Sequence, residues 1–136
     1  MTQFRRVTDR ISVSPQIALA DVDAAAAEGF RLIINNRPDG EDPAQPPSRE
    51  FEAAAANAGL AYAHIPVRGG PTREQVESQR QLIAQADGPV LAFCRSGTRS
   101  IVTWAVGEAL SGDRSREELV QLGHAAGYDL SGVLPG

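Results

Sequence analysis

Hydrophobic and polar positions change their spacing in blocks along the chain, and these blocks predict strands and helices in turn. Short apolar runs typical of buried strands occur at 32–34, 62–67 and 90–93. Strand-forming residues around a Thr8-Asp9 turn signal predict a hairpin or two edge strands over 4–13. Helical composition or spacing is found at 18–28, 48–59, 72–86, from about 100 to 110, and 115–126. This alternation predicts a single three-layer α/β domain over residues 1–136, with a mostly parallel central sheet of four or five strands flanked by helices.

Residue types that often begin helices stand at the start of several of the predicted helices. Ser48 is expected to cap the second helix, and the segments 72–75 and 115–118 both fit a capping box. The segment 35–47 contains four prolines and three acidic residues, which predicts a long loop. Long loops in compact domains often carry function.

Composition narrows the classes of function. With 42% hydrophobic and 22% charged residues, the 136-residue chain has the balance of an ordinary globular domain. Its net charge is −4, and all 13 basic residues are arginines without a basic run, so we expect no nucleic-acid partner. The apolar stretches are too short to span a membrane, and residues 1–7 lack the apolar core of a secretion signal, so we expect a cytoplasmic protein. One cysteine and two histidines predict neither a disulfide, nor a metal site, nor a cofactor.

The residues with the clearest chemical meaning follow the apolar run at 90–93. In open α/β sheets, ligands bind at the edge formed by the carboxyl ends of the strands. A short loop with a glycine in its middle can turn successive backbone N–H groups toward one point, and the positive end of the next helix strengthens this anion site. Such surroundings favour the thiolate form of a cysteine. We therefore predict an anion-binding loop made of Cys94, Arg95, Ser96, Gly97, Thr98, Arg99 and Ser100.

Within this loop, Cys94 is the predicted nucleophile. Arg99 supplies a fixed charge on a planar fork that suits an oxyanion, and Ser100 can donate a hydrogen bond to the sulfur. Arg95 is expected at the rim, where it would attract an anionic substrate. A lone cysteine is more often a small core residue, but the arginines, glycine and hydroxyls around this one indicate a reactive thiol.

These residues resemble known families. The segment Cys94–Ser100 is similar to the active-site loop of rhodanese-type sulfurtransferases, and the wider pattern resembles dual-specificity phosphatases. Together with 32–41 and 62–67, it resembles a bacterial family in particular, the phosphatase-like domain of β-lactamase-hydrolase-like proteins, over roughly residues 4–112. Members of that family are labelled either phosphatases or sulfurtransferases. The resemblance implies a cysteine-phosphatase-like fold, with a rhodanese-like fold as the alternative.

Two departures from the phosphatase pattern favour sulfur chemistry. Only four residues separate Cys94 from Arg99, where the phosphatase signature has five, and a shorter ring of amides suits a single sulfur better than a phosphoryl group. The segment 68–70 is Arg-Gly-Gly, where dual-specificity phosphatases have a general-acid aspartate. We therefore predict a sulfurtransferase that takes sulfane sulfur from thiosulfate or a persulfide, holds it as a Cys94 persulfide and passes it to an external thiol acceptor.

Two alternatives remain open. The first is a phosphatase that cleaves phosphate monoesters, including phosphotyrosine, through a phosphocysteine, with a general acid from the acidic part of the 35–47 loop. Asp39 is the named candidate for this acid, with Glu41 and Asp42 beside it, and Arg37 is a candidate second anion ligand. The other alternative is an anion-binding or redox-sensing module without turnover.

Overall fold

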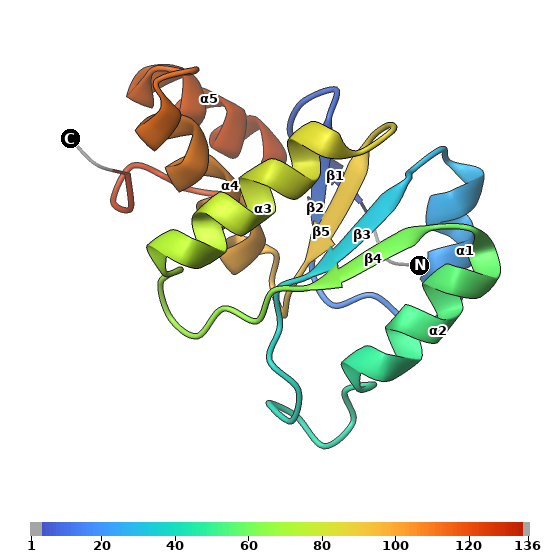
Figure 1. The fold of residues 1–136 in the computed structure, drawn as a ribbon. Helices are drawn as coiled ribbons and strands as arrows, with labels where there is room; N and C mark the ends of the chain where they lie inside the picture. The colour runs from blue at the N-terminus through green and yellow to red at the C-terminus, as the bar shows by residue number, and fades with distance from the viewer. Residues whose placement is uncertain (1–3, 135–136) are drawn as a thin grey trace.

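The computed structural model describes residues 4–134 of the chain, and a five-stranded sheet forms its centre (Figure 1). The order across the sheet is β1-β2-β5-β3-β4, and only the pairing of β1 with β2 is antiparallel. Residues 1–3, which belong to the chain start considered above, lie outside the described part. The strands are β1 (Arg5–Arg6), β2 (Ile11–Ser14), β3 (Leu32–Asn35), β4 (Ala61–His64) and β5 (Val90–Phe93).

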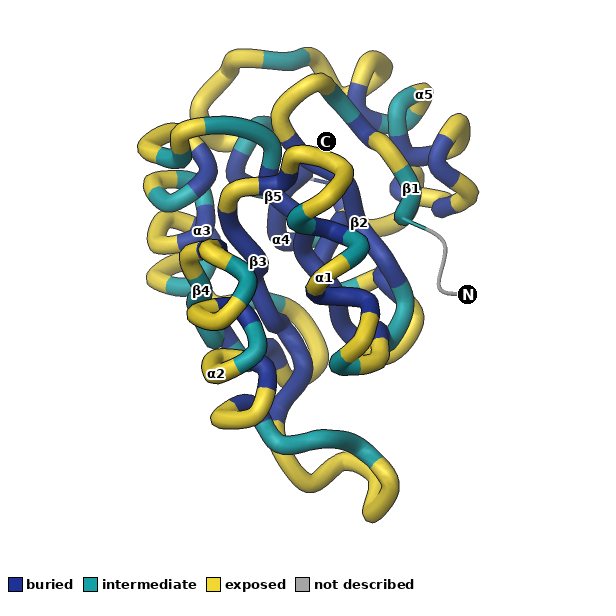
Figure 2. The backbone as a smooth tube through the Cα atoms, turned by 90° about the vertical axis from the view of Figure 1, so that its right-hand side faces the viewer, coloured by how far each residue is buried: buried dark blue, intermediate teal, exposed yellow. Residues whose placement is uncertain are grey.

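Helices cover both faces of this sheet, and each face has its own apolar core. One core joins the sheet to α1 (Ala20–Ala27) and α2 (Ser48–Ala58). The other joins it to α3 (Arg73–Gln85), α4 (Thr98–Ser111) and α5 (Arg116–Ala126). In Figure 2 the central strands are buried between the two helical layers. The predicted three-layer α/β fold with a mostly parallel sheet is confirmed.

Several local predictions need correction. The first strands do form a hairpin, but only β1 is an edge strand, because all four residues of β2 are buried and pair in parallel with β5. The apolar run at 62–67 ends as a strand at His64 rather than at residue 67. The helix expected from about residue 100 begins at Thr98, because Gly97 takes a left-handed conformation with φ of 92° and starts the helix early.

The three predicted helix caps are formed to different extents in the structure. Thr72 and Gln75 form the expected reciprocal capping box at the start of α3. Ser115 caps α5, but the side chain of Glu118 bonds to Arg114 instead of reaching back. Ser48 is the first residue of α2 rather than its cap.

The sheet order brings three loops to one edge. Ser14, Phe93 and Asn35 end neighbouring parallel strands and lie in register across them. The segments that follow β2, β5 and β3 therefore leave the sheet side by side, as Figure 1 shows for the long loop before α2 and the short loop before α4. Among residues 4–134, no helix has both the length and the apolar composition needed to cross a bilayer.

We expect Phe51→Ala to lower the free energy of unfolding by about 3–5 kcal/mol, because it empties a buried site next to the strand that carries the site loop. Phe51 is 1% exposed, and its ring centroid lies 5.1 Å from that of Phe93. Urea unfolding followed by circular dichroism measures the change. The exposed neighbour Glu52→Ala is the control, and equal stabilities of the two variants would contradict the assignment of Phe51 to the core.

Candidate active site

The cysteine sulfur is enclosed by its own loop. Cys94 follows β5 directly and is fully buried. Its Sγ accepts a hydrogen bond from the Gly97 amide at 3.1 Å, and its own amide donates to the Ser14 carbonyl at 3.4 Å. The first residue after β5 is therefore held against the end of β2, with its sulfur facing the turn that follows.

The carbonyl groups of Arg95, Ser96 and Gly97 in this turn each accept a hydrogen bond. The pairs are Gln16 N to Arg95 O at 3.1 Å, the Tyr128 hydroxyl to Ser96 O at 2.8 Å, and Ile101 N to Gly97 O at 3.0 Å. In a trans peptide the C=O and the following N–H point in opposite directions, so a bound carbonyl also fixes the direction of the next amide. The Gly97 amide donates to the sulfur, and the Thr98 amide donates to the Ser96 hydroxyl at 3.3 Å, so the wider cluster of amides stays a prediction.

Only glycine fits at position 97. Its φ of 92° is a backbone conformation that residues with a Cβ rarely adopt. A Cβ built at this position would lie 2.0 Å from the Tyr128 hydroxyl oxygen and 3.3 Å from the Ser14 carbonyl carbon. The loop is thus packed closely from behind.

Arg99 is held in one orientation by two partners. Its Nη1 donates to Glu41 Oε2 at 2.7 Å and to the Val67 carbonyl at 2.9 Å, and its Nη2 donates to Glu41 Oε1 at 2.9 Å. A guanidinium has five N–H groups, so the Nε–H and the second Nη2–H remain. These two groups lie on the same side of the guanidinium and form a fork that suits two oxygens of one anion.

Charge links Arg99 to the cysteine and to the loop before α2. The hydrogen bond with Glu41 raises the pKa of Arg99 against the opposing effect of burial, and the neighbouring Cys94 raises it further. Arg37 is 4% exposed and donates from Nε to Glu41 Oε1 at 2.9 Å and from Nη1 to Gln16 Oε1 at 2.9 Å. Arg37 and Arg99 therefore share the Oε1 atom of Glu41.

Glu41 is a carboxylate at neutral pH. Its hydrogen bond with Arg99, together with that from Arg37, lowers its pKa to about 2 although partial burial acts in the other direction. The structure brings Glu41, rather than Asp39, to Arg99. Asp39 is exposed, and its Oδ1 accepts a hydrogen bond from the Ser48 amide at 2.8 Å at the start of α2.

The other predicted loop residues divide between rim and interior. Arg95, Ser96 and Thr98 are exposed at the rim, where the Ser96 and Thr98 hydroxyls bond to each other at 2.9 Å. Ser100 is fully buried, and its hydroxyl has no hydrogen-bond partner among residues 4–134. The predicted bond from this hydroxyl to the sulfur is absent, so a buried donor is left free beside the loop.

Sequence reasoning missed Gln16 and Tyr128, which hold the loop carbonyls. Gln16 follows β2 and Tyr128 follows α5, so neither lies within ten residues of the cysteine, and neither belongs to a recognisable motif. Glu41 was weighed only as an acid, because the spacing from 41 to 99 says nothing about a contact between the two side chains.

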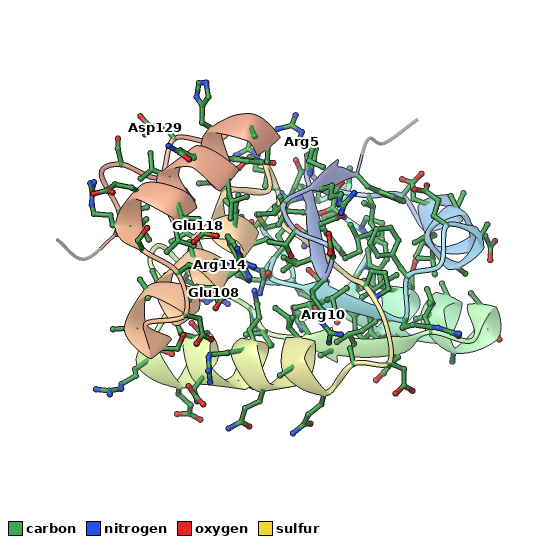
Figure 3. The ribbon with its side chains drawn as sticks, turned by 90° about the horizontal axis from the view of Figure 1, so that it is seen from above. Arg5, Arg10, Glu108, Arg114, Glu118 and Asp129 are labelled. Atoms are coloured by element: carbon green, nitrogen blue, oxygen red, sulfur yellow. The ribbon has the colours of Figure 1, made fainter. Side chains whose placement is uncertain are left out.

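A cavity of about 190 Å³ lies away from this site, at the edge where the strands begin. Arg10, Glu108 and Arg114 are among the residues that line it, and Figure 3 shows these three side chains from above. Arg10 is engaged there, because its guanidinium donates to carbonyls at the end of α3. Between residues 4 and 134, no group of three or more histidine, cysteine or acidic side chains is placed to hold a metal ion.

The sheet order, the helical layers and the loop after β5 define a protein of the cysteine-phosphatase-like fold class. Comparison with protein families agrees. The family described as beta-lactamase hydrolase-like protein, phosphatase-like domain, matches residues 3–111, and the chain belongs to this family.

Individual relatives support the same assignment. A beta-lactamase hydrolase-like protein of Agrobacterium fabrum is 40% identical over 126 residues, covering 92% of this chain but only 29% of the length of that relative. The crystal structure of a candidate phosphatase from Neisseria meningitidis is 35% identical with a TM-score of 0.84, over 94% of this chain and 91% of that one. Tk-PTP in its active form, 21% identical with a TM-score of 0.71 over 94% and 87% of the two chains, shows a likeness of fold alone.

These comparisons confirm the resemblance to the phosphatase-like domain family. They support the phosphatase alternative and a phosphate-ester substrate. They give no specific support to the leading prediction of a sulfurtransferase, or to thiosulfate, a persulfide or a thiol acceptor as its partners.

The low pKa of Glu41 predicts how its ion pairs contribute to stability. The pKa in the folded protein, about 2, is below the ordinary value of 4.5. The pairs therefore stabilise the folded state fully above that ordinary value, and this contribution is lost as the pH falls through about 2. Thermal unfolding measured from pH 7 to pH 2 should give the native protein a higher melting temperature than Glu41→Gln at pH 7. The difference between the two melting temperatures should shrink as the pH falls toward 2. The exposed Glu52→Gln is the control, and parallel curves for native protein and Glu41→Gln would contradict the assignment.

Proposed function

We propose that this domain hydrolyses phosphate monoesters with Cys94 as the nucleophile. The observation that carries the proposal is the buried Cys94 sulfur beside Arg99, whose Nε–H and second Nη2–H are not used by Glu41 or Val67, in a member of a phosphatase-like family. The Gly97 amide at 3.1 Å favours a negative sulfur, and the Arg99 N–H groups that Glu41 and Val67 do not use are suited to phosphoryl oxygens.

The reaction has two steps. In the first, the Cys94 thiolate attacks phosphorus, an S–P bond forms, and the P–O bond breaks with its electron pair leaving on the ester oxygen. In the second, water attacks phosphorus, the S–P bond breaks, and thiolate and inorganic phosphate are released, the water proton passing to phosphate or solvent. Arg99 and the inward amides of the loop stabilise the charge on the phosphoryl oxygens in both steps.

The surroundings of the leaving group favour esters of acidic alcohols. Glu41, with a pKa of about 2, holds two arginines and carries no proton to donate at neutral pH. Asp39 would have to leave its bond to the Ser48 amide before it could act as the general acid. We therefore infer a preference for aryl phosphates, such as phosphotyrosine, over alkyl phosphates, because an aryl oxide leaves without prior protonation.

We expect Cys94→Ser to abolish hydrolysis of p-nitrophenyl phosphate, and Arg99→Lys to lower kcat about 10²–10³-fold, because lysine keeps the charge but loses the fork. Initial rates at saturating substrate measure both effects. Arg31→Lys, an exposed arginine at the opposite edge of the sheet, is the control. Hydrolysis that continues in pure Cys94→Ser would rule out Cys94 as the nucleophile.

Sulfur transfer is a second candidate. It is supported by the spacing of four residues between Cys94 and Arg99. It is also supported by the hydrogen bonds that already occupy the carboxylates of Asp39 and Glu41, because this reaction needs no general acid. In this reaction the Cys94 thiolate attacks the outer sulfur of thiosulfate. A new S–S bond forms, the S–S bond of thiosulfate breaks, and sulfite leaves with the electron pair. Sulfite is a stable anion and needs no general acid.

Intact mass measurement after incubation with thiosulfate separates the two candidates. The phosphatase proposal predicts an unchanged mass alongside hydrolysis of p-nitrophenyl phosphate. A gain of one sulfur atom in the native protein that is absent in Cys94→Ser, without phosphate release, would replace it with sulfur transfer.

A further inference from the structure

The segment after α5 reaches the active-site loop from behind. Tyr128 follows Gly127, which ends α5 with a φ of 96°, and it lies beyond residues 3–111, the part that the family comparison matches. Its side chain is 9% exposed, and its hydroxyl donates to the Ser96 carbonyl at 2.8 Å. The catalytic loop therefore has a partner from the far end of the described chain.

That hydrogen bond acts on the same peptide unit that contacts the nucleophile. The Ser96 carbonyl and the Gly97 N–H belong to one planar trans peptide, whose two polar groups point in opposite directions. One accepts from Tyr128, and the other donates to Cys94 Sγ at 3.1 Å. Fixing the carbonyl toward the tyrosine fixes the amide toward the sulfur.

The tyrosine ring is itself held in place. The guanidinium carbon of Arg5, from β1, lies 5.2 Å from the ring centroid, and the Tyr128 amide donates to Gly123 O at 2.8 Å. Figure 3 shows Arg5 where β1 approaches the end of α5. Burial raises the pKa of Tyr128, so its hydroxyl keeps its proton through the neutral range.

We propose that Tyr128 is a positioning residue that holds the Ser96–Gly97 peptide with its amide toward Cys94 and thereby keeps the sulfur reactive. The inference rests on the proposed role of Cys94 as the nucleophile. Without the hydroxyl, the Ser96 carbonyl loses its partner, and Gly97, which has no Cβ, can rotate the peptide away from the sulfur.

The other groups near the sulfur are unaffected by loss of this hydroxyl. Among the described residues, Arg99 from α4 and Tyr128 both lie close enough to Cys94 to feel its charge, and Glu41 reaches the site through Arg99. Tyr128→Phe keeps the ring against Arg5 and removes the hydroxyl, which donates to Ser96 and also interacts with the Arg5 side chain. A change in cysteine reactivity in this variant therefore reports on the peptide.

The test is the pH dependence of Cys94 alkylation by iodoacetamide, followed by intact mass well below the melting temperature of each variant. We expect the midpoint of the rate profile to move up by about one pH unit in Tyr128→Phe, the scale of losing one hydrogen bond to a charged group. Tyr62→Phe is the matched control, because it removes a half-buried hydroxyl that bonds to Ser48 and Asn35 and should leave the midpoint unchanged.

A folded Tyr128→Phe with the native alkylation profile would overturn the inference. Faster hydrogen exchange of the Gly97 amide in Tyr128→Phe than in the native protein is a second expected result, and unchanged exchange would likewise count against it. Neither measurement uses a substrate. If the native protein failed to hydrolyse p-nitrophenyl phosphate while Tyr128→Phe still shifted the midpoint, the proposed function would fall and the positioning role would stand.

Discussion

The hydrogen bonds accepted by three successive carbonyls after β5 are the constraint on which the site depends. A carbonyl without a hydrogen-bond partner costs free energy in a packed loop. Each of these carbonyls therefore keeps its orientation only while its donor is present. The donors belong to the segment after β2, to α4 and to the segment after α5. A loop of a few residues thus has a defined shape because three separate parts of the fold each donate a hydrogen bond to its backbone.

The order of the sheet explains why those parts meet. β5 lies between β2 and β3, so the end of each neighbour opens beside the cysteine loop. The neighbour on one side brings Gln16 to the loop backbone, and the neighbour on the other brings Arg37 and Glu41. The Gln16 side chain also accepts a hydrogen bond from Arg37, so the segments that follow β2 and β3 are joined directly to each other. Backbone shape and side-chain charge therefore come from the same sheet edge.

Most of the fold could be predicted from the sequence, because it depends on local signals. The apolar run of β5, the alanine-rich helices and the capping box at Thr72 each have a pattern within a few residues. The cysteine loop was found for the same reason. The position of β2 inside the sheet was not, since four residues of mixed polarity suit an edge or an interior strand equally well.

The contacts that complete the site had no such signal. Glu41 lies 58 residues from Arg99, and Tyr128 lies 32 residues from Ser96, so only the packed fold brings them together. The choice of Asp39 over Glu41 as the functional acid followed from loop composition, which cannot distinguish a carboxylate that binds a helix amide from one that binds two arginines. The role of Asp39 in catalysis stays a prediction.

The shared peptide between Tyr128 and Cys94 also links binding to the distant end of the chain. Any anion that draws the Gly97 amide toward itself polarises the same peptide and strengthens the bond that its carbonyl accepts from the tyrosine. Because thermodynamic coupling is reciprocal, an anion that strengthens the Tyr128–Ser96 hydrogen bond is itself bound more tightly when that hydrogen bond is formed. The stability of the segment after α5 and the binding of an anion at the cysteine loop are therefore thermodynamically coupled.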